Sequence, residues 1–380
     1  MKILFAPDSF KGTMSSMRVI EILTQAAKQN FPDAQIVKVP IADGGEGTVE
    51  ALVTAAGGQY RTVNVTGPLG EKVSAVYGVI DGKTAVIEMA QASGIILLKE
   101  AEKNPLYTTT YGTGELIKAA LDDGIRRVVI GIGGSAANDG GIGAAQALGV
   151  RFPDKNGADV GYGGKALCDI ARVDASGMDP RIRECEINVI CDVSNPLTGP
   201  AGATYVYGPQ KGADKECLEQ LERGMDNYLQ IIKNYNGMDM NQVPGSGAAG
   251  GLGAALVAFF GAHLKSGIDT VLDFVAFDDL LKDVDFVVTG EGKIDNQSAY
   301  GKVPVGIAKR CMSKGIKVIA ISGCMGKDAR KVFDYGIDSI MVTVNKTVSL
   351  EEALMKAEED LYDAADRMFR LVKLGMDLRA

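Results

Sequence analysis

The chain has 380 residues, of which 46% are hydrophobic and 23% charged, a composition typical of a globular protein with sizeable cores. Its formal net charge is −8 and its Asp and Glu residues are dispersed, so we expect neither a nucleic-acid nor a membrane partner, since both favour a basic face. The N-terminal apolar run is too short for a signal peptide, and we expect a cytoplasmic protein.

Short apolar segments alternate with helical segments at both ends of the chain. Ser15 or Ser16 can cap the first helix, whose apolar residues recur at helical spacing. Fully apolar, β-branched strands between helices are typical of a parallel sheet that is covered on both faces. The predicted strands are residues 2–6, 35–41, 285–288, 317–321 and 340–342.

The last helix is predicted to begin at Ser349, with Glu352 at the spacing of a capping box. We expect one continuous apolar face on this helix, because its apolar residues recur at helical spacing. The residues of this face are Leu350, Leu354, Leu361, Ala365, Met368 and Val372.

The middle of the chain changes character at about residue 60. Residues 62–66 alternate between polar and apolar, and Asp81-Gly82 between two apolar runs is a hairpin signal. These antiparallel cues are absent from the chain ends.

The sequence therefore predicts an α/β protein of two domains. A Rossmann-like, three-layer domain with a parallel sheet is expected from residues 1–60 and 281–380. A mixed α/β domain with antiparallel hairpins and glycine-rich loops is expected from the inserted residues 61–280. Small-molecule sites commonly lie at domain junctions, so a ligand cleft is expected there.

Two glycine-rich turns in the inserted segment precede helices, at residues 131–149 and 244–251. Exposed backbone N–H groups at such a turn attract anions. Neither turn has the context of a dinucleotide fingerprint or a Walker loop, and tight packing is the alternative explanation. The candidate nucleotide or phosphate contacts are Gly133, Gly134, Ser135, Asn138, Asp139, Gly245, Ser246 and Gly247.

Charged and amide side chains follow several of the predicted strands. Ligands of open parallel sheets bind outside the carboxyl ends of the strands, so these side chains are candidates for a site. Taken singly, each is also compatible with a solvated surface turn. The candidates are Asp8, Ser9, Lys11, Asp43, Glu46, Asp192, Asn195, Gln210, Lys211, Glu291, Asp295 and Lys302.

Other catalytic chemistries have little support. The only His, His263, is expected to be buried or half-buried at the end of a helix predicted over residues 252–264, and the Cys residues include no C-x-x-C pair. A His relay, a thiol nucleophile and a zinc site are therefore not expected. Carboxylates and lysines remain, and phosphoryl transfer requires such groups.

Several long motifs occur in order along the chain: APDSFKGTMS, VPIADGGEGTVEAL, VTGPLGEKV, GTGEL, GIGGSAANDGG, YGPQKGA, PGSGAAGGLGAAL and VTGEGKIDNQSAYGKVP. Together they resemble the bacterial glycerate kinase family over nearly the whole chain. The resemblance implies Mg²⁺-assisted phosphorylation of D-glycerate by ATP, usually to 2-phosphoglycerate, by a protein of two α/β domains. Ala137 stands where the family pattern more often has Thr, which removes one hydroxyl from that loop.

Roles for the candidates follow from this expected reaction. Lys11, Asp43 and Asp192 are the expected catalytic residues, with Asp192 first among the candidates for the base, and Glu291 and Asp295 are expected near Mg²⁺. Phosphorylation at the 3-hydroxyl, a small-molecule kinase of the GHMP type and a non-catalytic acid-binding protein are the alternatives. A monomer or small homo-oligomer is expected. The expected substrate contacts are Asp8, Ser9, Glu46, Asn195, Gln210, Lys211 and Lys302.

Overall fold

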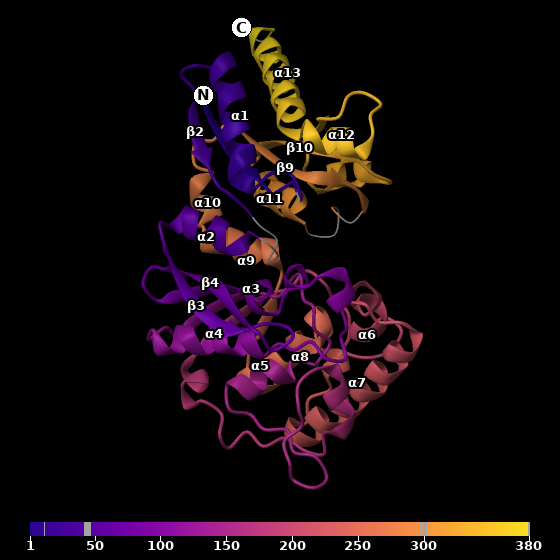
Figure 1. Cartoon of the computed structure of the whole chain (residues 1–380). Helices are drawn as coiled ribbons and strands as arrows, with labels where there is room; N and C mark the ends of the chain where they lie inside the picture. The colour runs from indigo at the N-terminus through magenta and orange to yellow at the C-terminus, as the bar shows by residue number, and fades with distance from the viewer. Residues whose placement is uncertain (11, 42–46, 297, 299–301, 379–380) are drawn as a thin grey trace. The chain divides into compact units, whose positions relative to one another are not determined.

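The chain folds into two compact units, which Figure 1 shows in a computed structural model. The structure describes residues 1–10, 12–41, 47–296, 298 and 302–378. Unit 1 consists of Met1–Asp43, Glu50–Ala56 and Gly267–Ala380, and unit 2 of Gly44–Val49 and Gly57–Ser266. Residues 267–280, which were expected in the inserted domain, therefore lie in unit 1. Residues 47–49 and 57–60, which were expected in the domain of the chain ends, lie in unit 2.

Unit 1 is built on a five-stranded parallel sheet in the order β11-β10-β9-β1-β2. Its strands are β1 (Lys2–Pro7), β2 (Gln35–Lys38), β9 (Phe286–Ile294), β10 (Lys317–Met325) and β11 (Ser339–Val342). Its helices are α1 (Ser16–Asn30), most of α2 (Thr48–Ala56), α9 (Gly267–Phe274), α10 (Phe277–Leu280), α11 (Val303–Met312), α12 (Leu350–Met355) and α13 (Ala357–Asp377).

Helices cover both faces of this sheet. Ile3 and Phe5 of β1 pack with α1 and α13 in one core cluster. Successive strand residues point to opposite faces, so Leu4 and Ala6 face the other side, where α11 contacts β1, β9 and β10. The α/β class and the parallel sheet at the chain ends are confirmed.

The order of the strands creates a switch point between β1 and β9. From β1 the chain continues to β2 on one side, and from β9 it continues to β10 and β11 on the other. Open α/β sheets bind ligands outside the carboxyl ends of the strands at such a point. The topology therefore predicts a ligand site at the residues that follow β1 and β9.

Unit 2 contains a six-stranded mixed sheet in the order β3-β4-β5-β6-β7-β8. The pairs β3–β4 and β4–β5 are antiparallel, as the hairpin cues predicted, and β5 to β8 are parallel. Its strands are β3 (Gln59–Thr66), β4 (Lys72–Ile80), β5 (Thr84–Glu88), β6 (Arg127–Gly131), β7 (Glu186–Ile190) and β8 (His263–Lys265). Its helices are α3 (Ala90–Ser93), α4 (Tyr111–Asp122), α5 (Ile142–Ala147), α6 (Ala203–Tyr207), α7 (Lys215–Asn236) and α8 (Ala248–Phe260).

The helix predicted over residues 252–264 ends earlier than expected. Gly261 adopts the left-handed conformation at φ 64°, which is a common way to end a helix. His263 then begins the edge strand β8 and is exposed, so the expectation of a buried or half-buried histidine was wrong.

The apolar stripe of the last helix is also divided. The helix breaks at Lys356, whose backbone leaves helical geometry at φ −101° and ψ 13°, and this separates α12 from α13. Leu361 and Met368 are buried against the sheet and α1, whereas Leu350 and Leu354 are 75% and 46% exposed. The prediction of one uninterrupted helix with a continuous apolar face from Ser349 was therefore wrong at Lys356.

None of the helices in the described part of the chain combines the length and the apolar sequence needed to cross a lipid bilayer.

Candidate active site

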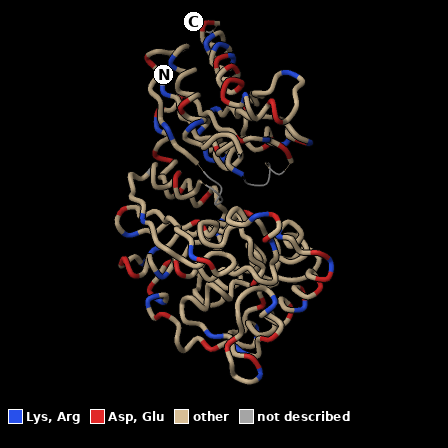
Figure 2. The backbone as a smooth tube through the Cα atoms, in the orientation of Figure 1, with Lys and Arg blue, Asp and Glu red and all other residues tan. Residues whose placement is uncertain are grey.

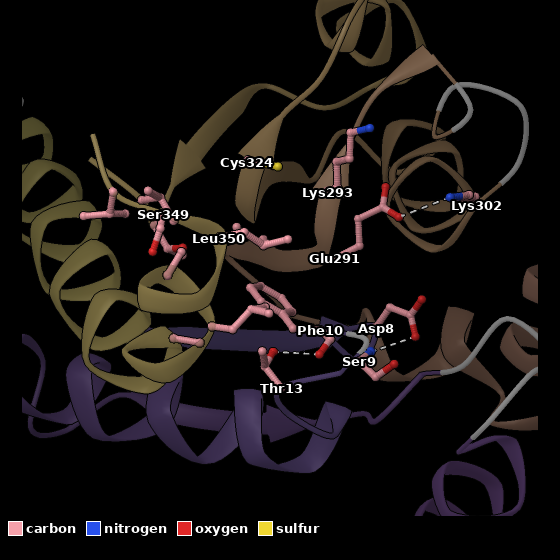
Figure 3. A pocket seen from close by; sticks show the side chains of 18 residues that line it. Asp8, Ser9, Phe10, Thr13, Glu291, Lys293, Lys302, Cys324, Ser349 and Leu350 are labelled. Carbon is pink, nitrogen blue, oxygen red and sulfur yellow. Dashed lines mark hydrogen bonds and ion pairs between the residues drawn. The ribbon is translucent and has the colours of Figure 1, made fainter. Parts of the chain in front are cut away.

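A cavity of about 610 Å³ lies at the carboxyl ends of the unit 1 strands (Figure 3). Asp8, which follows β1, and Glu291, within β9, contribute carboxylates to its lining, and Cys324 comes from the end of β10. Residues after β11 and in α12 complete the wall. The remaining lining residues are Ser9, Phe10, Thr13, Gly292, Lys293, Lys302, Gly323, Thr343, Val344, Val348, Ser349, Leu350, Ala353, Leu354 and Ala357.

The two carboxylates are brought together by the pairing of β1 with β9. Pro7 is the register partner of Gly290, and the Asp8 backbone N–H donates to the Gly290 carbonyl over 2.8 Å. Asp8 and Glu291 thus follow adjacent paired positions, and both side chains are almost fully buried. The Ser9 backbone N–H donates to Asp8 Oδ1 over 2.7 Å, which orients that carboxylate.

Polar partners also fix Glu291. The Ser298 hydroxyl donates to Glu291 Oε1, and the Lys302 ammonium lies 3.9 Å from Oε2 (Figure 3). Lys302 comes directly before α11. Nearby, Lys293 and Asp295 form an ion pair of 3.1 Å, so Asp295 lies beside the cavity without lining it.

The opposite end of the cavity is mainly apolar, with Thr13 and Ser349 as polar residues in its lining (Figure 3). Figure 3 places Phe10 and Leu350 at this end and Glu291 and Lys302 at the other. Val344 and Val348 come from the segment between β11 and α12, and Leu354 from α12. None of these residues was predicted as a site residue from the sequence. Leu350 and Leu354 have the same helical spacing as the buried residues of the stripe, so no sequence signal distinguishes them as cavity residues.

The first glycine-rich turn of unit 2 is exposed only at its start. Gly133 and Gly134 are exposed after β6, and the Gly134 carbonyl accepts from the Ile95 backbone N–H. Ser135 is largely buried, and its hydroxyl accepts from the Ala137 backbone N–H over 3.1 Å. Only the first part of this turn therefore presents itself to solvent.

Asn138 and Asp139, in the same turn, point into the protein and are fully buried. Asp139 accepts from the Thr110 backbone N–H over 2.8 Å and from the Gly141 backbone N–H over 3.0 Å. Burial raises the pKa of Asp139, and these hydrogen bonds partly oppose that shift. Both residues have structural partners, since Asn138 Nδ2 donates to Thr204 Oγ1 over 3.3 Å. Their contact with phosphate stays a prediction.

Lys211 is a buried cation in this region. Its Nζ donates to the Ala137 carbonyl over 2.5 Å. Burial lowers the pKa of Lys211 to about 7, and the Asp139 carboxylate opposes that shift. Lys211 thus binds the turn that contains Ala137 from the interior of the protein. Its neighbour Gln210 is exposed.

The second glycine-rich loop packs closely against other backbone segments. A Cβ at Gly247 would lie 2.1 Å from the Pro196 carbonyl oxygen, and one at Gly250 would lie 2.1 Å from that of Ala137. The Gly247 N–H donates to the Asn195 carbonyl over 3.0 Å. A Cβ at Gly245 would lie 3.0 Å from Cys191 Sγ. Packing therefore explains why this loop needs glycine.

The start of α8 is not a regular helix terminus. Ala249, Gly250 and Gly251 have positive φ angles, and the Gly251 N–H donates to the Gly247 carbonyl. Ser246 is buried, and its hydroxyl lacks a hydrogen-bond partner among the described residues. A phosphate contact from residues 245–247 stays a prediction.

The carboxyl ends of β5 and β7 carry two further acids. Asp192 follows β7 and is exposed, while Asn195 accepts from the Tyr207 hydroxyl over 2.7 Å and donates to the Ala201 carbonyl. Glu88, which the sequence analysis missed, ends β5, and its Oε1 accepts from the Val49 N–H over 2.8 Å. The predicted site residues Lys11, Asp43 and Glu46 lie outside the described residues.

Among the described residues, no three His, Cys, Asp or Glu side chains are grouped to hold a metal ion. Magnesium that is bound mainly through substrate phosphates needs only one or two protein carboxylates. Asp8 and Glu291 are such a pair of hard oxygen donors on one cavity wall, so these residues fit Mg²⁺ held together with a phosphate.

Comparison with known proteins agrees with the sequence motifs. The profile of the Glycerate kinase family matches residues 3–373. The chain is 48% identical to the glycerate kinase of Bacillus subtilis, over 99% of this chain and 98% of that protein. It is 46% identical to the glycerate 2-kinase of Escherichia coli, over 99% of each.

A solved structure supports the same relationship. A Salmonella typhimurium protein assigned as glycerate kinase 2 superposes with a TM-score of 0.89 at 45% identity, covering 99% of each chain. The resemblance in the motifs is thereby confirmed at the level of sequence and of fold. The chain belongs to the glycerate kinase family and is an enzyme of that family.

Proposed function

We propose that the protein transfers the γ-phosphoryl group of ATP to the 2-hydroxyl of D-glycerate, with Mg²⁺, and releases 2-phosphoglycerate and ADP. Family membership supports the kinase activity, and the name of the Escherichia coli relative, glycerate 2-kinase, supports the 2-hydroxyl. The expected cytoplasmic location and the monomeric or small homo-oligomeric state stay predictions.

The observation that carries this proposal is the pair of buried carboxylates at the switch point, with Lys302 3.9 Å from one of them. Phosphoryl transfer needs positioned charges around the phosphates more than it needs covalent help. When bound, Mg²⁺ offsets the negative charge of the phosphate oxygens. Asp8 and Glu291 are the residues that would hold it, with Asp295 nearby, and Lys302 supplies a cation for the phosphates.

In the transfer, the glycerate 2-hydroxyl oxygen forms a bond to the γ-phosphorus while the bond from that phosphorus to the β-phosphate oxygen breaks. The hydroxyl proton passes to a carboxylate. Asp192 is the proposed acceptor, because it is exposed at the carboxyl end of β7 and the only His is placed in an edge strand. Lys11 and Asp43 remain proposed catalytic residues on the strength of their sequence positions.

Phosphorus NMR of the product tests this function. The protein is incubated with ATP, Mg²⁺ and D-glycerate, and the new phosphate ester resonance is recorded without proton decoupling. Coupling to the single proton on C2 is expected for 2-phosphoglycerate. Coupling to the two protons on C3 would show 3-phosphoglycerate and overturn the assignment of the hydroxyl. No new ester resonance would overturn the activity itself.

A further inference from the structure

One end of the unit 1 cavity is lined by Phe10, which belongs to the hydrophobic core, and by leucines that the core leaves exposed. Leu350 and Leu354 are 75% and 46% exposed and both line the cavity, with Phe10, Val344 and Val348 beside them. They begin the apolar stripe that α13 continues into the core, and the break at Lys356 directs them to the cavity instead. Exposed apolar side chains that line a concave, preformed site indicate a partly apolar ligand.

We propose that this apolar end binds the adenine base of ATP, with the phosphates extending to Asp8, Glu291 and Lys302 at the other end. The proposal deepens the proposed function, because it rests on ATP being the phosphoryl donor. A base has an apolar ring face and a nucleotide carries its negative charge at the far end of the molecule. The cavity likewise has a mainly apolar end and a charged end (Figure 3).

The volume of the cavity and its apolar lining favour a nucleotide over glycerate as the ligand. The cavity volume of about 610 Å³ falls in the range of about 300 to 1,000 Å³ that is usual for drug-sized ligands. Glycerate is a three-carbon acid with two hydroxyls, and it has no apolar face to cover Leu350 and Leu354. Burial of these side chains is favourable only against an apolar group. The apolar wall therefore selects the nucleotide as the occupant.

The position in the fold agrees with this choice. The cavity lies at the carboxyl ends of β1, β9 and β10, where the strand order reverses. Crevices at this point of open parallel sheets bind nucleotides in unrelated proteins. The sequence alone instead predicts nucleotide contacts in unit 2, at Gly133, Gly134, Ser135, Asn138, Asp139, Gly245, Ser246 and Gly247.

The first test replaces the apolar wall. In the double variant Leu350→Asn with Leu354→Asn, we expect KM for ATP to rise at least tenfold, about 1.4 kcal/mol, while KM for glycerate changes less than twofold. The matched control is Leu371→Asn with Leu374→Asn, because these leucines are 61% and 55% exposed on α13 and do not line the cavity. An unchanged KM for ATP in the first variant, with glycerate still phosphorylated, would overturn the inference and leave the proposed function intact.

The second test reads occupancy in the unsubstituted protein. Cys324 lines the cavity and is exposed, and Cys168 is exposed in unit 2, so the rate of thiol alkylation can be followed at both by mass spectrometry. We expect ADP and adenosine each to slow alkylation of Cys324 at least fivefold and to leave Cys168 unchanged. D-Glycerate is expected to change neither rate.

Protection of Cys324 by D-glycerate but not by adenosine would place the acid in the cavity and contradict the proposal. Because this readout needs no turnover, protection by adenosine in a protein that fails to phosphorylate glycerate would preserve the site and remove the proposed function. The two failures are thus distinguishable.

Discussion

Both units carry glycine-rich loops, yet the loops of the two units have different roles. In unit 2, glycines such as Gly247 and Gly250 let backbone segments approach each other within distances that a Cβ would block. In unit 1, the segments after β1 and in β9 line a cavity with carboxylates at one end and leucines at the other. Glycine density alone therefore does not distinguish a packing loop from a binding loop.

The largest loss of activity is expected from substitution of Asp192, the unit 2 residue that is proposed to accept the hydroxyl proton. Asp192→Asn keeps the shape of the side chain but cannot accept a proton at neutral pH. We expect kcat to fall by about two to four orders of magnitude with little change in the dissociation constant of glycerate. Steady-state kinetics and calorimetry measure the two quantities.

The exposed Asp169, also in unit 2, provides the control substitution Asp169→Asn, which is expected to leave kcat unchanged. If Asp192→Asn retains more than about a tenth of the original kcat, the proton passes to another carboxylate, and Asp43 is the next residue to substitute.

In unit 1 we expect the next largest effect, from Glu291→Gln. This change removes one negative charge from the pair with Asp8 while it keeps the acceptor for the Ser298 hydroxyl. We expect kcat/KM for ATP to fall by about two to three orders of magnitude, and the Mg²⁺ concentration for half-maximal rate to rise.

Glu359→Gln on α13 is the matched control for this substitution, because Glu359 is exposed and does not line the cavity. An unchanged requirement for Mg²⁺ in Glu291→Gln would remove Glu291 from the metal and leave it a structural partner of Ser298 and Lys302.

The packing role of the unit 2 loops predicts a loss of stability. Gly250 has φ 68°, and a Cβ there would lie 2.1 Å from the Ala137 carbonyl oxygen. We expect Gly250→Ala to lower the free energy of unfolding by about 3 kcal/mol, from left-handed strain together with overpacking. Urea denaturation followed by circular dichroism measures it.

Gly237 separates these two contributions, because its φ is 79° and a Cβ there meets nothing within 4 Å. Gly237→Ala is expected to cost about 1 kcal/mol, from strain alone. Equal losses in the two variants would show that the close approach at Gly250 contributes little and would weaken the packing account.

The smallest effect is the pH dependence that Lys211 contributes. Its pKa in the folded protein is about 7, below its ordinary value near 10.4, so between these values the unfolded chain binds more protons than the folded one. Stability from this group is therefore gained as pH rises. We expect the difference in unfolding free energy between the unsubstituted protein and Lys211→Met to shift by about 2 kcal/mol in favour of the former from pH 7 to pH 9.

Urea denaturation of both proteins at the two pH values measures this shift. Because every other titrating group is shared, the difference isolates the buried amine. A difference that stays constant with pH would mean that Lys211 keeps its charge in the folded protein up to pH 9.

Much of the fold could be predicted from the sequence, because strands buried on both faces leave clear apolar runs. The parallel sheet of the chain ends was predicted from such runs. The hairpin between β4 and β5 was predicted from the Asp81-Gly82 turn between two apolar runs. The early end of α8 could not be predicted, since a single glycine, Gly261, decides it through its left-handed conformation. The break at Lys356 could not be predicted either, because no Pro or Gly lies near it in the sequence.

The candidate site was predictable only in part. Asp8 and Glu291 could be named because each comes after a short apolar run, and Lys302 because it lies just beyond the loop that contains Glu291. The structure brings all three to one cavity. Leu350 and Leu354 could not be recognised, because helical spacing is the same for a core stripe and for a cavity wall. Asn138 and Asp139 occur in a turn typical of anion binding, and only the structure shows their partners inside the protein.

A crystal structure with ADP and Mg²⁺ tests the assignment of the nucleotide most directly. We expect the adenine ring to contact Leu350 and Leu354 at the apolar end of the unit 1 cavity, with the β-phosphate near Glu291 and Lys302. A nucleotide bound instead on residues 133–135 or 245–247 of unit 2, with the unit 1 cavity empty, would contradict the account.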